Sequence, residues 1–158
     1  MSELALPKID HSIVDKKNEI VRKLSKLINS ENVLSEADEL RPYETDALSV
    51  YTQTPLAVVL PENTKEVSEI LKYCNSENIK VVPRGAGTGL SGGALPLQDA
   101  VLLGLGKFNK ILEIDYENKC VVTQPGVTNL GITHAVEHKG FYYAPDPSSQ
   151  LACSIGGN

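Results

Sequence analysis

The most informative stretch of the chain reads Val81-Val82-Pro83-Arg84-Gly85-Ala86-Gly87-Thr88-Gly89-Leu90-Ser91-Gly92-Gly93-Ala94. Five of these fourteen residues are glycine, and Thr88 and Ser91 add small hydroxyl groups. Because the stretch follows an apolar run, we expect a strand that opens into a loop. Without Cβ atoms, successive backbone N–H groups can converge and form an anion-binding concavity. The stretch therefore predicts a nucleotide-type cofactor.

Two better-known phosphate-binding loops do not fit this stretch. Gly87-x-Gly89-x-x-Gly92 matches the dinucleotide pattern in letters, but that pattern requires a helix immediately after it. Gly93 and Pro96 follow instead, and then a short apolar run at 101–103. The phosphate loop of nucleotide hydrolases ends in Gly-Lys-Ser/Thr, which is absent here. A purely structural loop is the remaining alternative, and the number of glycines with interleaved hydroxyls argues against it.

The bulk composition is that of an ordinary globular protein. The chain has 158 residues, of which 41% are hydrophobic and 22% charged, and its net charge is −5. This charge argues against nonspecific binding to nucleic acid or to anionic membranes. The three cysteines are widely spaced and match no metal pattern, so we expect reduced thiols and a cytoplasmic protein. We find neither a secretory signal nor a membrane-spanning stretch.

The first half of the chain predicts a β-α-β unit. Residues 16–29 have the apolar spacing of an amphipathic helix, and residues 31–55 are mixed and rich in loops. Residues 56–60 and 79–82 are apolar runs typical of buried strands. Between them, Asn63 precedes Glu66 at the spacing of a helix N-cap. The two strands should be parallel, which places the glycine-rich loop at the carboxyl end of a strand, where ligands bind in α/β sheets.

The second half predicts a strand, a hairpin and a helix. Residues 100–105 form another apolar run, and residues 111–115 and 120–124 are typical of a hairpin. A helix is expected over 129–139, with Thr128 as its N-cap and Gly140 as its stop.

This last predicted helix carries the sequence His134-Ala135-Val136-Glu137-His138, which matches the inverted zinc-protease pattern. A catalytic zinc site needs a third protein ligand from a later segment. Because Asp146 is the one carboxylate after this helix, we expect a solvated helix face and no metal.

The C-terminal segment contains a second candidate ligand-binding motif. Prolines fix the backbone around Asp146, and Ser148, Ser149 and Gln150 supply polar side chains. Gly156-Gly157 offers a second backbone that a ligand can approach closely. An ordinary loop and turn is the alternative, but with the glycine-rich stretch this segment predicts the opposite side of one cofactor site.

These paired motifs, 83–94 with 145–150 and 155–158, closely resemble the FAD-binding domain of FAD-linked oxidases of the vanillyl-alcohol oxidase/p-cresol methylhydroxylase (PCMH) type. Within that family they look most like the flavin subunit of bacterial glycolate oxidase and the related D-lactate dehydrogenases. The resemblance runs from about Asp38 to the last residue. It implies that FAD is bound by Pro83, Arg84, Gly85, Ala86, Gly87, Thr88, Gly89, Ser91, Gly92, Gly93, Pro125, Gly126, Pro145, Asp146, Ser148, Ser149, Gly156, Gly157 and Asn158.

The resemblance also implies a fold. The family's FAD-binding domain is α+β and consists of two α/β subdomains with FAD between them. We expect an N-terminal helical segment at 1–37, a first subdomain at 38–96 and an incomplete second subdomain at 97–158. Family members continue beyond this motif, so the resemblance implies an N-terminal piece, truncated at its C-terminal end. Some relatives attach FAD through a histidine in the glycine-rich loop, and because this loop has none, noncovalent FAD is expected.

The implied activity is oxidation of a small 2-hydroxy acid, such as glycolate or D-lactate, to the 2-oxo acid. No residue here matches a catalytic position of the family, so none is assigned. Other subunits of a glycolate-oxidase-like complex are the expected partners, and they could hold the protein at the periphery of the inner membrane. The alternatives are a non-catalytic remnant, a split subunit that needs a second chain, and a phosphate-binding module without redox chemistry.

Overall fold

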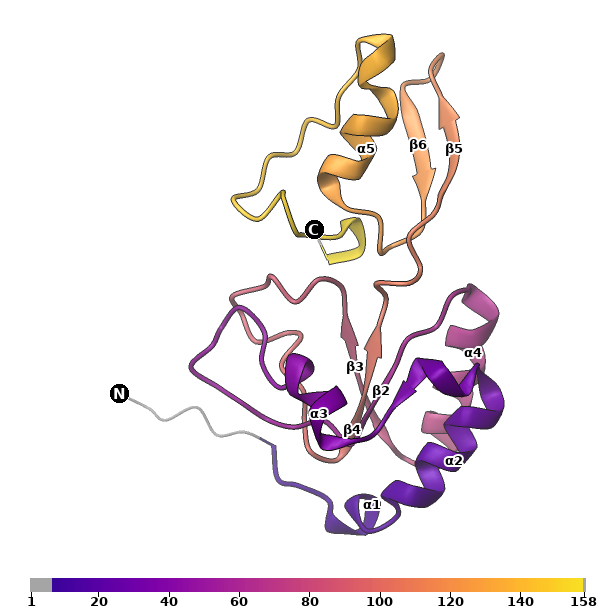
Figure 1. Cartoon of the computed structure of the whole chain (residues 1–158), viewed down its shortest axis with the longest axis vertical. Helices are drawn as coiled ribbons and strands as arrows, with labels where there is room; N and C mark the ends of the chain where they lie inside the picture. The colour runs from indigo at the N-terminus through magenta and orange to yellow at the C-terminus, as the bar shows by residue number, and fades with distance from the viewer. Residues whose placement is uncertain (1–6, 158) are drawn as a thin grey trace.

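The computed structural model describes residues 7–157. Figure 1 shows a sheet with its helices in one region, and a hairpin with one helix and the C-terminal segment in another. The elements in chain order are α1 (His11–Val14), α2 (Lys17–Leu27), η1 (Ser30–Asn32), β1 (Val33–Leu34), α3 (Ala37–Leu40), η2 (Arg41–Tyr43), β2 (Ala57–Val59), α4 (Thr64–Ser76), β3 (Lys80–Arg84), β4 (Ala100–Gly104), β5 (Ile111–Asp115), β6 (Cys120–Thr123), α5 (Asn129–Val136), η3 (Glu137–Lys139) and η4 (Ile155–Gly157).

We call residues 7–104 the sheet lobe. Its four strands lie in the order β1-β2-β4-β3, with β4 parallel to both β2 and β3 and β1 antiparallel to β2. The expected parallel orientation of β2 and β3 is confirmed, but β4 lies between them. The expected boundary at residues 96 and 97 assigned β4 to the second subdomain. Because β4 is a central strand of this sheet, a boundary after Gly104 agrees better with the strand pairing.

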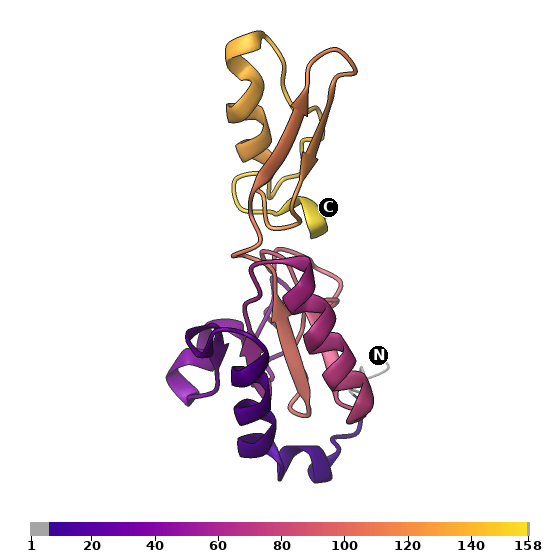
Figure 2. The same ribbon diagram turned by 90° about the vertical axis from the view of Figure 1, so that its right-hand side faces the viewer.

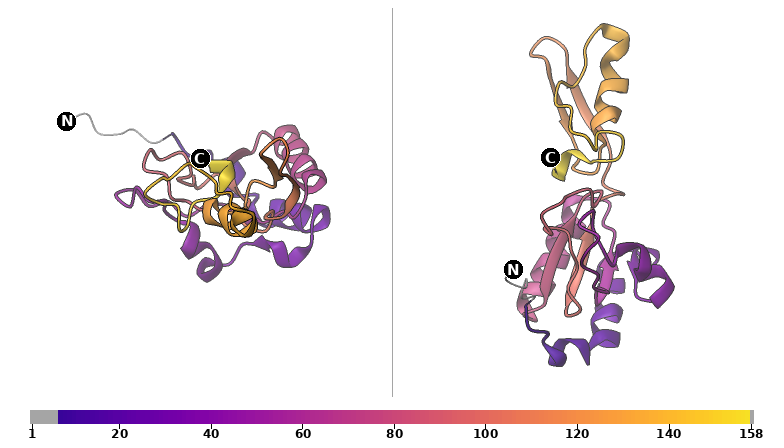
Figure 3. Two further views of the ribbon diagram at one scale, coloured as in Figure 1. Left: turned by 90° about the horizontal axis from the view of Figure 1, so that it is seen from above. Right: turned by 90° about the vertical axis from the view of Figure 1, so that its left-hand side faces the viewer.

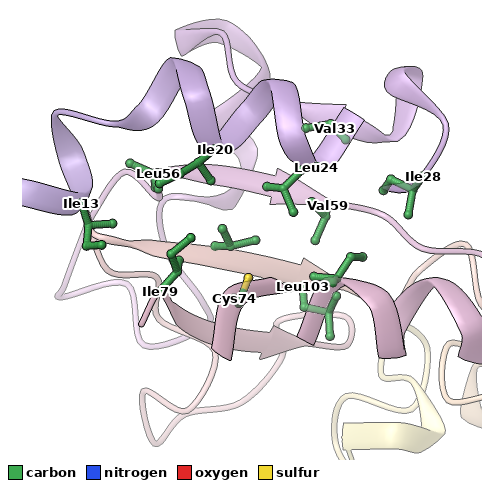
Figure 4. Close-up of a cluster of buried hydrophobic side chains, with 12 residues drawn as sticks. Ile13, Ile20, Leu24, Ile28, Val33, Leu56, Val59, Cys74, Ile79 and Leu103 are labelled. Atoms are coloured by element: carbon green, nitrogen blue, oxygen red, sulfur yellow. The ribbon is translucent and has the colours of Figure 1, made fainter. Parts of the chain in front are cut away.

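The core of the sheet lobe lies on both faces of the sheet. Side chains alternate along β2 and β4, so that Val59 and Leu103 join the cluster under α2 and α4, whereas Val58 and Leu102 pack with Leu40 of α3. Figure 2 shows α2 and α4 lying over one face of the sheet, and Figure 4 shows the side chains between them. All five residues of β4 are buried, as expected for a central strand of a parallel sheet.

The N-cap of α4 and the apolar face of α2 lie where the sequence predicts. Asn63 caps α4 by accepting a hydrogen bond from the Glu66 N–H at 3.0 Å, and the Glu66 carboxylate accepts from the Glu62 N–H at 2.8 Å. Ile20 and Leu24 of α2 are buried on the predicted apolar face. The mixed stretch 31–55 contains β1, α3 and η2, none of which was predicted there. Since β1 pairs with β2, the expected N-terminal helical segment also contributes a strand to the sheet.

We call residues 111–157 the hairpin lobe. The predicted hairpin is confirmed as β5 and β6, which are antiparallel. Thr128 caps α5 by accepting from the Gly131 N–H at 3.1 Å, and Gly140, with φ of 77°, ends the 3-10 turn that extends the helix. Figure 3 shows this lobe standing away from the sheet lobe, with a narrow connection between them.

Residues 7–157 contain no helix that is both long enough and apolar enough to cross a membrane.

Candidate cofactor site

An open pocket of about 380 Å³ lies where the two lobes meet. It forms at the carboxyl ends of β3 and β4, where α/β sheets bind ligands. The sheet lobe contributes the glycine-rich loop, and the hairpin lobe contributes its C-terminal segment. The lining residues are Pro83, Arg84, Gly85, Ala86, Gly87, Thr88, Gly89, Ser91, Gly93, Ala94, Leu105, Ser154, Gly156 and Gly157.

Backbone hydrogen bonds hold the C-terminal segment in place beside the pocket. The Ile155 N–H donates to the Val127 carbonyl and the Gly156 N–H to the Pro125 carbonyl, both at 2.8 Å. Gly126 in turn donates to the Phe108 carbonyl at 2.8 Å, which ties this segment to the connection between the lobes. The pocket wall in the hairpin lobe is therefore set by main-chain pairing.

The glycines of the site fall into two groups. At four of them a Cβ atom would overlap protein atoms: Gly85 against Ser154, Gly87 against Arg84, Gly126 against Leu105 and Gly156 against Pro125. At three others, all on the pocket wall, a Cβ would meet nothing within 4 Å: Gly89, Gly93 and Gly157. Chain packing explains the first group. The second group keeps open a surface that a ligand can approach closely.

Arg84 is the one charged residue among those that line the pocket. Its Nη1 donates to the Thr45 carbonyl at 2.6 Å, and its Cζ lies 5.8 Å from the centroid of the Tyr43 ring. Burial lowers the pKa of the Arg84 guanidinium, and this is the largest effect on it, while nearby Asp46 and Tyr43 oppose the shift. The side chain is thus engaged by the segment 43–46.

Ser154 is a pocket residue that the sequence analysis did not select. Its side chain lies against Gly85, is only 6% exposed, and its Oγ has no hydrogen-bond partner among the described residues. A buried hydroxyl without a partner carries a desolvation cost, which a polar ligand group can relieve. The signal was present in the sequence, because a small hydroxyl residue stands two positions before Gly156-Gly157.

Several of the expected site residues lie elsewhere. Gly92 lines a neighbouring, mostly apolar pocket of about 550 Å³, together with Leu95 and Tyr51. Pro125 and Gly126 lie behind the pocket wall and support Gly156. Four expected residues of the segment 145–149 do not line the pocket: Pro145, Asp146, Ser148 and Ser149. The position of this segment is set in part by a 3.0 Å hydrogen bond that the Asn129 side chain donates to the Pro145 carbonyl. Asn158 lies outside the described residues.

Within the part of the chain that the structure describes, no group of three or more His, Cys, Asp and Glu side chains is placed to hold a metal ion.

The pocket and the fold agree with the comparison to protein families. Residues 55–158 match the family described as FAD binding domain. The chain therefore belongs to this family of FAD-binding domains. Individual proteins of known sequence and structure are also similar to this chain.

The chain is 47% identical over 154 residues to the glycolate oxidase subunit GlcD of Escherichia coli K12, covering 98% of this chain and 30% of the relative. It is 36% identical to the mitochondrial D-2-hydroxyglutarate dehydrogenase of Arabidopsis thaliana, covering 84% of this chain and 24% of that one. The chain thus spans less than a third of the length of these relatives.

Solved structures show the same fold. Substrate-bound p-cresol methylhydroxylase superposes with a TM-score of 0.70 at 30% identity, covering 80% of this chain and 25% of that one. An alkyldihydroxyacetonephosphate synthase superposes with a TM-score of 0.79 at 19% identity, covering 98% and 30% of the two chains, and shows the fold alone. The expected α+β architecture of the PCMH type is confirmed.

Proposed function

We propose that this chain is the FAD-binding portion of an oxidoreductase that converts a small 2-hydroxy acid to the 2-oxo acid. The observation that carries the proposal is the glycine-lined pocket between the lobes. Three of its glycines leave open space that the packing of the chain does not require. The relatives named as glycolate oxidase and D-lactate dehydrogenase support the substrate class.

The residues of the pocket fit the diphosphate part of FAD. Gly89, Gly93 and Gly157 would let the ligand come close to the backbone, whose N–H groups can donate to phosphate oxygens. Thr88, Ser91 and Ser154 add neutral hydroxyl donors. We infer that the expected contacts of Pro145, Asp146, Ser148 and Ser149 would be made outside this pocket.

We propose that FAD is bound noncovalently, and the composition of the pocket wall supports this proposal. The described lining residues include no histidine, cysteine or tyrosine, so they offer no side chain typical of a covalent attachment to the flavin ring. The division into two subdomains belongs to the same proposal, with the boundary placed after Gly104.

Bound FAD would supply the oxidant for this reaction, as the hydride acceptor for the carbon that bears the hydroxyl group of the substrate. The chain's own part is to bind and orient the cofactor. We assign no catalytic residue to it. We also propose that the enzyme has several subunits, since the relative GlcD is named as a subunit of glycolate oxidase. We propose a cytoplasmic location.

A cofactor titration tests the binding site. We expect the purified chain to bind FAD and to acquire the visible absorbance of a bound flavin. Gly89→Ala places a methyl group in the open pocket and should weaken FAD binding by about tenfold or more, since it blocks close approach of the phosphates. Gly106→Ala is the matched control, because Gly106 also has open space at Cβ but does not line the pocket. Equal FAD affinities for the two variants would refute the site.

The substrate class needs a separate experiment. A chimera would carry this chain in place of the corresponding segment of the E. coli glycolate oxidase subunit. We expect it to hold flavin and to be bleached by glycolate or D-lactate without oxygen. A chimera that holds flavin but is not reduced by either acid would contradict the proposed substrate. Gly89→Ala in the chimera should reduce its flavin content, and Gly106→Ala in the chimera is the matched control.

A further inference from the structure

The guanidinium of Arg84 is oriented by the segment 43–47 of the sheet lobe. It donates to the Thr45 carbonyl at 2.6 Å and lies over the Tyr43 ring. The sequence analysis placed Arg84 among the residues expected to bind FAD. In the structure this cation is engaged by a backbone carbonyl and an aromatic ring of its own chain.

The same guanidinium packs against the glycine-rich loop. Gly87 has φ of 72°, and a Cβ at this position would overlap the Arg84 side chain. The Ala47 N–H donates to the Gly87 carbonyl at 2.9 Å, so the loop and the segment 43–47 are also joined by main chain. Arg84 therefore lies between Thr45 and Gly87, and contacts both.

Asp46 completes this arrangement. Its side chain is 5% exposed, and its Oδ1 accepts from the Leu48 N–H at 2.8 Å. Its charge favours the cationic form of Arg84 against the cost of burial. A planar guanidinium can donate to a carbonyl, stack on a ring and pack flat against a glycine at the same time, whereas a lysine ammonium cannot.

We propose that Arg84 is a positioning residue: it holds the glycine-rich loop in its binding conformation by bracing Gly87 against the segment 43–47, and it does not act as the charge that binds the cofactor phosphates. The part of this inference that concerns FAD rests on the proposed function. The part that concerns the brace can be tested without the cofactor.

The first test is hydrogen exchange of the cofactor-free chain. The Ala47 amide reports the bond to Gly87 directly. We expect it to exchange about tenfold faster or more in both Arg84→Lys and Arg84→Gln, because the brace is lost in each. Arg41→Gln is the matched control, since Arg41 is a nearby, exposed arginine. Wild-type protection of the Ala47 amide in both Arg84 variants would overturn the brace.

The second test is FAD affinity as a function of salt concentration. A brace predicts that Arg84→Lys weakens FAD binding about tenfold although the charge is kept, and that the salt dependence stays that of the wild type. A phosphate ligand predicts the opposite: Arg84→Lys binds normally, and Arg84→Gln loses both affinity and salt dependence. The second result would overturn the inference. If the wild type binds no FAD at all, the proposed function fails, and the exchange experiment still decides on the brace.

Discussion

The sheet lobe and the hairpin lobe bury their side chains to very different degrees. In the sheet lobe, β4 is buried along its whole length and two apolar clusters cover the two faces of the sheet. In the hairpin lobe, β5 and β6 have no buried residue, and Leu112, Val122 and Tyr142 are exposed. A two-stranded sheet needs further packing to be stable, so the sheet lobe should carry most of the stability of this chain.

The largest test of this contrast is a pair of leucine truncations. Leu102→Ala removes a side chain of β4 that is fully buried against Val58 of β2 and Leu40 of α3, and should lower the free energy of unfolding by about 2–5 kcal/mol. Leu112→Ala removes one that is 61% exposed on β5, and should cost less than about 0.5 kcal/mol. Urea denaturation followed by circular dichroism measures both. Similar losses would show that the hairpin lobe is packed as tightly as the sheet lobe.

The next test addresses the junction between the lobes. A Cβ at Gly126 would overlap the Leu105 carbonyl and lie 2.8 Å from the Phe108 carbonyl oxygen, so Gly126→Ala forces backbone movement. We expect a loss of about 1–3 kcal/mol in unfolding free energy, as for other overpacked sites. Gly106→Ala has open space and should leave stability unchanged. An unchanged Gly126→Ala variant would mean that the lobes separate easily.

The next test compares how an aspartate in each lobe makes the stability of the protein depend on pH. The largest single effect on the pKa of Asp99 is burial, which raises it. Hydrogen bonds from Lys80 Nζ at 2.6 Å and from the Asp10 N–H at 2.7 Å, together with the charge of Lys80, outweigh burial and leave the pKa lowered. A carboxylate with a lowered pKa stabilises the folded protein at pH values above the pKa that it has in the unfolded chain. This contribution is lost as the pH falls through its pKa in the folded protein.

Asp99→Asn should therefore cost about 1–3 kcal/mol at neutral pH, and the difference from wild type should shrink below the ordinary aspartate pKa of about 3.9. In the hairpin lobe, hydrogen bonds from Asn118 lower the pKa of Asp115, which is not buried, so Asp115→Asn should have the smaller effect. Thermal unfolding over a pH series measures both. An Asp99→Asn penalty that persists unchanged in acid would contradict the electrostatic explanation.

The smallest effect concerns thiol reactivity. Burial raises the pKa of Cys74 in the sheet lobe to about 11, whereas Cys120 in the hairpin lobe is exposed. Because the thiolate is the reactive form, a thiol reagent at mildly alkaline pH should label Cys120 rapidly and Cys74 only after unfolding. Cys120→Ser is the control and should remove the fast phase. A fast phase that survives this substitution would place a second reactive thiol at the surface.

Local sequence signals predicted most of the elements correctly. The Asn63 and Thr128 caps, the hairpin turn and Gly140 are each encoded within a few neighbouring residues, and each lies where expected. The elements that were missed are short: β1 is a two-residue strand, α1 and α3 are four-residue helices, and the others are three-residue 3-10 turns. Segments of this length contain too little periodicity to predict them.

The arrangement of the sheet and of the site required tertiary information. Strand β4 has the same apolar character whether it lies beside β3 or begins a second subdomain, and only its pairing with β2 and β3 distinguishes the two. Likewise, the sequence selected the glycine-rich loop as the site but did not show which glycines face open space and which pack against protein atoms.

The sequence by itself determined the family, the glycine-rich loop at the end of a strand and its pairing with the C-terminal Gly156-Gly157, because these depend on residue type and short-range spacing. The tertiary structure alone decided that Arg84 is held by Thr45, that Ser154 lies buried against Gly85, and that the segment 145–149 lies away from the lining of the pocket. These features depend on residues far apart in the chain, whose distances are set by the packing of the two lobes.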